Sequence, residues 1–129
     1  MRAYVKVFVY APLASATRAA DGRVFEDPLG ELLKLVGGMA DRGVGVIGNY
    51  DNVSFTFAKG TGRYRAGPSA NPTMGEIGKV HAEEEAILTF VAPKEMLGEL
   101  VRAIKDNHPY ETPAIEAFDL LRHEADGLG

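Results

Sequence analysis

The sequence contains no cysteine and only three histidines, His81, His108 and His123. A chain without cysteine can form no disulfide, no thiolate nucleophile and no thiolate metal site. The three histidines lie far apart in the sequence and no motif resembles a nucleophile elbow, so no Ser–His–Asp arrangement can be recognised. The lack of cysteine is compatible with the cytoplasm, which is the location that we expect.

The chain also lacks an excess of basic residues and any long apolar run. Its 14 Lys and Arg residues face 18 Asp and Glu residues, a formal net charge of -4, whereas a nucleic-acid surface needs a basic face. Apolar runs such as AILTFVA are far shorter than the ~20 residues that cross a bilayer. The N-terminal MRAYVKVFVYAP alternates and has no apolar stretch typical of a signal peptide. We therefore expect neither a nucleic-acid partner nor a membrane partner.

What the sequence does contain is typical of one globular domain. Of its 129 residues 46% are hydrophobic and 25% are charged, which is enough to bury a core. We expect residues 1–129 to form a single domain. Within it, the small and polar residues 11–26 predict a surface loop, and residues 122–129 predict a frayed tail.

In the first half of the chain, alternating apolar and polar residues predict a strand over Ala3–Tyr10. A helix should follow, with Asp27 as its N-cap, Pro28 in its first turn and Gly43 just after its end. The sequence VSFTF then predicts another strand. The residues Lys59–Gly62 (KGTG) predict a turn that closes a hairpin onto the next three residues.

The second half starts with a loop rich in Gly, Pro and Ser, residues Gly67–Gly78. A long strand is expected at Lys79–Ala92, then a helix opened by Pro93, then a strand at about Pro113–Leu121. One face of the long strand should carry Val80, Ala82, Ala86, Leu88 and Phe90. The resulting order predicts an α+β, ferredoxin-like βαββαβ sandwich with both helices on one sheet face, an extra hairpin and a long Gly/Pro loop.

The segment DNHPYETPA, Asp106–Ala114, has two interpretations. It can be a structural elbow between helix and strand, stiffened by its two prolines. Alternatively, His108 and Glu111 lie close enough in sequence to form a binding pair. Such a pair would raise the pKa of the imidazole, or would hold a metal ion together with Glu85. A second stretch with metal-ligand residue types is His81, Glu83 and Glu85 on one strand face.

The glycine-rich stretch GTGRYRAGPSANPTMGEIG does not match a phosphate-binding P-loop. A loop of this length is uncommon in a compact domain unless it has a role. It is therefore either an ordered binding surface that lines a cleft or a plain connection. The candidate ligand-binding residues are Tyr50, Gly62, Asn71, Gly75 and Tyr110.

Several segments together resemble one family. GVGVIGNYDNVSFTF, GTGRYRAGPSANPTMGEIGKV, Glu85 and NHPYETPAIEAFDLL are similar to the domain inserted in bacterial Nif-three family proteins, the dinuclear-metal-centre or GTP cyclohydrolase type II-like proteins. The resemblance covers about Val44–Leu121. It implies a fold similar to CutA and PII proteins and assembly as trimers. Asn52 and Val53 stand where the family often has His and Cys, and Ile87 and Thr89 where it often has Arg and Glu.

The resemblance implies a function as well. We expect a non-enzymatic, homotrimeric module without catalytic residues that binds a small ligand, a metal ion or a partner protein at clefts between subunits. The only cofactor we consider is a divalent metal ion. The alternative is a metal-dependent hydrolase in which His108 acts as acid–base beside Glu111 or Glu85. Against it, the family's two-metal site needs several histidines from the domains flanking the insert, and three scattered histidines do not supply them.

Overall fold

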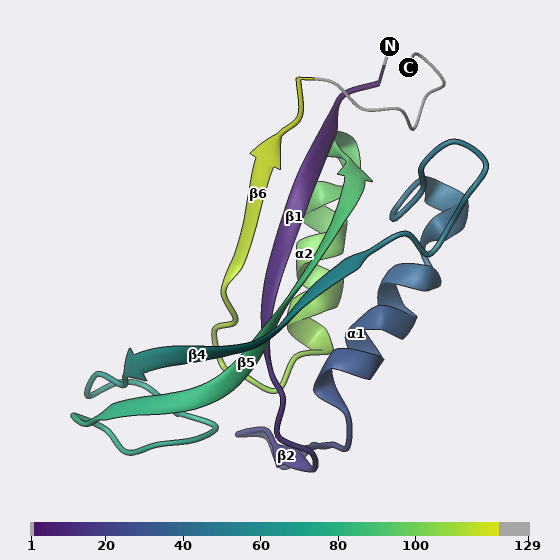
Figure 1. Ribbon diagram of the computed structural model, residues 1–129. Coiled ribbons are helices and arrows are strands. Elements are labelled where there is room, and N and C mark those ends of the chain that lie inside the picture. The colour runs from purple at the N-terminus through teal and green to yellow at the C-terminus, as the bar shows by residue number, and fades with distance from the viewer. Residues whose placement is uncertain (1, 122–129) are drawn as a thin grey trace.

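Four antiparallel strands form a sheet whose one face carries both α-helices (Figure 1). The computed structural model describes residues 2–121, so the tail predicted at 122–129 lies outside the described residues. The sheet order is β4-β5-β1-β6, which is the ferredoxin-like arrangement that the sequence predicts. The main elements are β1 (Tyr4–Pro12), α1 (Pro28–Gly37), β4 (Phe55–Arg65), β5 (Val80–Pro93), α2 (Leu97–Asp106) and β6 (Ile115–Asp119).

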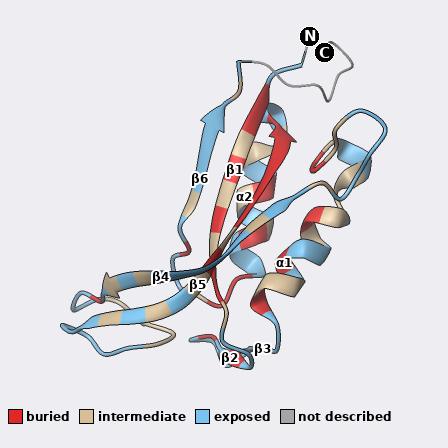
Figure 2. Ribbon diagram, viewed as in Figure 1, coloured by how far each residue is buried: buried red, intermediate tan, exposed pale blue. Residues whose placement is uncertain are grey.

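The core lies between the sheet and the two helices (Figure 2). Alternate side chains of β1 point into it, and β5 pairs with β1 over nine residues, so that its own buried residues lie beside them. Each helix contributes its apolar stripe. The central members are Val5, Val7, Val9, Leu32, Val36, Leu88, Phe90, Leu100 and Ile104. No helix within residues 2–121 is long and apolar enough to cross a membrane.

Helix α1 begins where the sequence predicts and ends earlier. The side chain of Asp27 accepts a hydrogen bond from the Gly30 amide at 3.0 Å, and Pro28 occupies the first turn. The α-helix stops at Gly37, and a short 3-10 turn, η1 (Ala40–Arg42), leads to Gly43 at φ 94°. Glycine at position 37 leaves room for the side-chain amide of Asn52, which a methyl group there would strike.

The segment predicted as a surface loop, residues 11–26, contains a small hairpin. Its strands are β2 (Thr17–Arg18) and β3 (Val24–Phe25), paired antiparallel, and Thr17 and Phe25 are buried. The connecting residues include Gly22 at φ 93°, a backbone conformation that glycine adopts without strain. The Asp-Gly dipeptide therefore marks a hairpin here.

The hairpin predicted at Lys59–Gly62 is wrong. These residues continue along β4, and Gly60 and Gly62 pair with residues of β5. A register shift after Phe57, with Lys59 at φ 65°, forms a β-bulge that accommodates one extra residue on β4. The β4–β5 ribbon consequently extends beyond the helices (Figure 1), which leaves Val80 70% exposed although the sequence pattern places it on the same face of the strand as Leu88 and Phe90.

Replacement of a core residue should show where the stability resides. We expect Leu100→Ala to lower the free energy of unfolding by about 2–5 kcal/mol, because a fully buried leucine leaves a cavity. The control is Leu33→Ala on the other helix, where the side chain is 38% exposed and the loss should be smaller. Urea denaturation measures both. Equal losses in the two variants would contradict this placement of the core.

Candidate functional site

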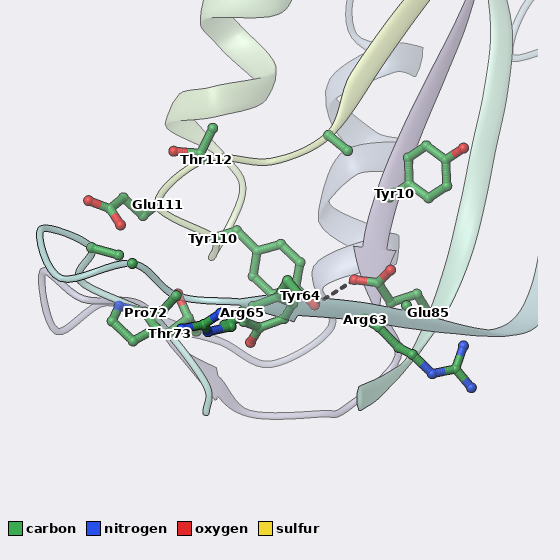
Figure 3. A pocket seen from close by; sticks show the side chains of 15 residues that line it. Tyr10, Arg63, Tyr64, Arg65, Pro72, Thr73, Glu85, Tyr110, Glu111 and Thr112 are labelled. Carbon is green, nitrogen blue, oxygen red and sulfur yellow. Dashed lines mark hydrogen bonds between the residues drawn. The ribbon is translucent and has the colours of Figure 1, made fainter. Parts of the chain in front are cut away.

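A cleft of about 470 Å³ lies where the β4–β5 ribbon meets the end of β1 and the turn between α2 and β6 (Figure 3). Three stretches of the chain that are distant in sequence line it together with one residue of β5, and the middle stretch comprises two adjoining segments. The stretches are the end of β1, the second half of β4 with the loop after it, and the α2–β6 turn. The two segments that the sequence singles out, the glycine-rich stretch and the HPYET turn, therefore border one cavity.

His108 holds the α2–β6 turn against β1. The residue is 1% exposed. Its Nε2 lies 2.7 Å from the carbonyl oxygen of Tyr10, and its Nδ1 accepts a hydrogen bond from the Tyr110 amide at 3.1 Å. Because Nδ1 must be an acceptor, the ring is neutral and the proton is on Nε2, which donates to the carbonyl.

Burial lowers the pKa of His108 below its ordinary value, and the hydrogen bond to the Tyr10 carbonyl offsets part of this shift. The raised pKa that the binding-pair interpretation implied is therefore not found. The reason is that Glu111 is not the partner of the imidazole. Both ring nitrogens are engaged by the backbone instead.

Tyr110 connects this turn to β5. Its ring lies between those of His108 and Tyr64, with centroids at 5.0 and 6.1 Å, and its hydroxyl donates to Oε2 of Glu85 at 2.8 Å (Figure 3). Burial first, and then the hydrogen bond to Glu85, raises the pKa of Tyr110, so the phenol stays protonated. Gly62 on β4 leaves room for the Glu85 carboxylate, which any side chain at that position would strike.

The loop after β4 is tied to the α2–β6 turn by two hydrogen bonds. The amide of Asn71 donates to Oε1 of Glu111 at 2.8 Å, and the hydroxyl of Thr73 donates to the carbonyl of Pro109 at 2.6 Å. The hydroxyl of Tyr64 also donates to a loop carbonyl, at 2.7 Å. The two segments thus form a joined wall of the cleft.

The candidate ligand-binding residues are only partly brought together. Gly62 and Tyr110 line the cleft, and Asn71 borders it through its bond to Glu111. Gly75 instead packs against the His81 side chain, at φ 87° with no room for a methyl group. Tyr50 is 75% exposed and is not among the cleft residues.

The predicted metal ligands do not converge. Both nitrogens of His108 face backbone groups, Glu85 bonds to a tyrosine hydroxyl, and Glu111 bonds to a loop amide. On one face of β5, Nε2 of His81 lies 3.2 Å from Oε2 of Glu83, whereas Glu85 bonds to the hydroxyl of Tyr110. Within residues 2–121 no three His, Asp or Glu side chains come close enough together to hold a metal ion.

Among the cleft residues that sequence reasoning missed are Tyr10, Tyr64 and Thr73. The signal for Tyr10 was present, because strand alternation places it on the sheet face away from the helices. Tyr64 became assignable only once its segment was known to pair with β5, opposite His81. Nothing in the sequence indicates that Thr73 bonds to the turn.

The pKa of His108 predicts a stability that depends on pH. Below pH about 6.5 the unfolded chain takes up a proton that the folded, buried ring accepts only at lower pH, so acid should favour unfolding. The free energy of unfolding should be constant above pH 7 and should fall as the pH drops through 6.5. His108→Gln should be less stable at pH 7 and lack this acid-dependent loss, whereas His81→Gln should keep it. Urea denaturation from pH 5 to 8 measures this, and the same acid loss in His108→Gln would contradict it.

Comparisons with known proteins agree with this architecture. Residues 77–126 match the model of the family CutA1 divalent ion tolerance protein. A GTP cyclohydrolase 1 type 2 homolog of Mycobacterium tuberculosis is 37% identical over 81 residues, 63% of this chain and 21% of the relative. The chain therefore spans about a fifth of that relative's length.

Two solved structures show the fold. The Bacillus cereus protein related to NIF3 superposes with a TM-score of 0.67 at 24% identity, over 96% of this chain and 27% of that one. CutA1 from Ehrlichia chaffeensis superposes with a TM-score of 0.60 at 14% identity, over 99% of this chain and 91% of that one. The chain therefore has a CutA-like fold, and it is similar to a segment of GTP cyclohydrolase 1 type 2 homologs and of a protein related to NIF3.

Proposed function

We propose that the chain is a non-enzymatic, CutA-like module that binds a small ligand in the cleft. The observation that carries the proposal is the joining of two distant loops across it, by the hydrogen bonds of Asn71 and Thr73. A long connection held in this way is ordered at a cost in chain entropy, which a plain linker would not need. The volume of about 470 Å³ lies within the usual range of ligand pockets.

The alternative, a metal-dependent hydrolase, finds less support in this geometry. Its acid–base group would be His108, yet the ring has no nitrogen left for a substrate and its pKa is lowered by burial. The phenol of Tyr110 stays protonated. Neither group can exchange a proton with a bound molecule near neutral pH without losing its hydrogen bonds.

A divalent ion is suggested by the description of the matching family, divalent ion tolerance. The described residues do not fit one, because the cleft carboxylates Glu85 and Glu111 are not joined by a third ligand. A protein metal site ordinarily needs three or more protein ligands. We therefore base no part of the proposal on a bound metal, and we include metal ions only among the ligands to be tested.

We further propose that the module is a homotrimer in which the cleft of each chain lies at a boundary between subunits. On the sheet face away from the helices, Phe55, Phe57 and Phe118 are 59%, 52% and 56% exposed. The ring of Phe118 packs edge-on against that of Phe8, with centroids 5.7 Å apart. The rings of Phe55 and Phe57 pack in the same way, with centroids 4.8 Å apart. These two exposed aromatic pairs, one at each edge of the sheet, favour burial against another copy, and within the described residues the edge strands β4 and β6 each have one side without a paired strand.

Light scattering tests the assembly. At micromolar concentration the protein should have three times the mass of one chain. Phe57→Asp should shift it toward the monomer, because the charge would be buried in the interface. Val24→Asp, at a residue 43% exposed on the small β2–β3 hairpin, should leave the trimer intact. A monomeric wild-type protein would refute the proposed trimer.

Thermal denaturation with a panel of nucleotides, metabolites and divalent metal ions tests the cleft. A ligand that binds the native state raises the melting temperature according to its concentration relative to Kd. We expect at least one such shift, and we expect Ala70→Trp to abolish it because the indole would fill the cleft. Leu33→Trp on α1 is the control that keeps the shift. Shifts that survive Ala70→Trp would place the binding site elsewhere.

A further inference from the structure

Two carboxylates of the cleft are held in place by uncharged donors. Glu85 accepts from the hydroxyl of Tyr110, and Glu111 accepts from the backbone amide of Asn71. In the described part of the chain neither carboxylate has an ion pair with Lys, Arg or His. Each has a second oxygen, Oε1 of Glu85 and Oε2 of Glu111, that bonds to no other described side chain. The cleft therefore presents fixed negative charge with acceptor capacity left over.

The same cleft is lined by the aromatic rings of Tyr10, Tyr64 and Tyr110. The faces of such rings carry negative electrostatic potential and attract cations, most strongly where water is excluded. The pKa of Tyr64 is raised, first by burial and then by the charges of Glu83 and Glu85. The negative potential of these carboxylates therefore extends to the tyrosine rings, where it favours a positive charge nearby.

Two arginines, Arg63 and Arg65, also border the cleft. Because side chains alternate along a strand, both lie on the face of β4 opposite to Gly62 and Tyr64. Figure 3 shows the guanidinium of Arg63 directed away from the hydrogen bond between Tyr110 and Glu85. Neither arginine forms an ion pair with a described carboxylate of the cleft. Neither Glu85 nor Glu111 is therefore held in an ion pair by a described residue, which leaves both carboxylates available to a bound cation.

We propose that the cleft binds a small organic cation, an ammonium or guanidinium group carried on an apolar body. This inference rests on the proposed function of the cleft as a ligand site. The charged group would donate to the remaining oxygen of Glu85, with Glu111 adding charge at the rim. The apolar body would lie against the tyrosine rings. Two carboxylates suffice for an ammonium group, whereas a metal ion requires more ligands.

Three probes of nearly equal size isolate the role of charge. At pH 7 phenethylamine is a cation, 2-phenylethanol is neutral and phenylacetate is an anion. Chemical-shift titration of ¹⁵N-labelled protein should give a Kd for phenethylamine at least tenfold lower than for the other two. Glu85→Gln and Glu111→Gln each retain an acceptor oxygen without the charge. Each substitution should raise the Kd for phenethylamine by about tenfold. Glu84→Gln, which removes an exposed carboxylate on the opposite face of β5, should not.

The outcomes separate this inference from the function on which it rests. If all three probes bind equally, or phenylacetate binds best, and Ala70→Trp abolishes binding, the cleft is a ligand site and the preference for cations is wrong. If phenethylamine does not bind at all, the inference is likewise refuted. If phenethylamine binds and its binding survives Ala70→Trp, the ligand binds elsewhere, and both the inference and the proposed role of the cleft are wrong. If Glu84→Gln loses as much affinity for phenethylamine as Glu85→Gln does, the preference for cations comes from the net charge of the protein and not from the cleft. That result would also refute the inference.

Discussion

A single buried imidazole determines where the cleft residues lie. His108 donates to the carbonyl of Tyr10 at the end of β1 and accepts from the amide of Tyr110 two residues further on. The bond to Tyr10 joins positions 98 residues apart, and the two bonds together require a neutral ring. They hold the α2–β6 turn against the end of β1. The position of this turn directs the Tyr110 hydroxyl to Glu85. Without this connection the cleft would lose one wall.

The other wall depends on the length of the β4–β5 ribbon. Because β5 has 14 residues, its first part extends past the helices and has no core to cover. Polar and aromatic side chains are tolerated there, and Glu85 and Tyr64 are half-buried by the two loops instead of by a helix. The closely packed end of the sheet supplies stability, and the projecting end supplies a surface that can vary in chemistry.

Local patterns in the sequence predict the elements that have a regular period. Alternation finds β1 and β5, and the caps at Asp27 and Pro28 find the start of α1. The glycines of β4 misled the prediction, because glycine marks a turn and a bulge equally well. The elbow was correctly located, whereas the alternative interpretation, a pair of His108 with Glu111, is not formed. Sequence spacing offered Glu111 as the neighbour of His108, whereas the actual partner was a backbone carbonyl that only the folded chain brings near.

The central claim is that the loop after β4 and the α2–β6 turn form one ordered wall. Amide hydrogen exchange tests it most directly, because the Asn71 amide has Glu111 as its acceptor and the Gly78 amide has the Ala66 carbonyl. Both amides should be protected in the native protein, and Glu111→Ala should remove the protection at Asn71 while leaving it at Gly78. Rapid exchange throughout Gly67–Gly78 in the unmodified protein would contradict the claim, because the loop would then be a flexible connection and not part of a site.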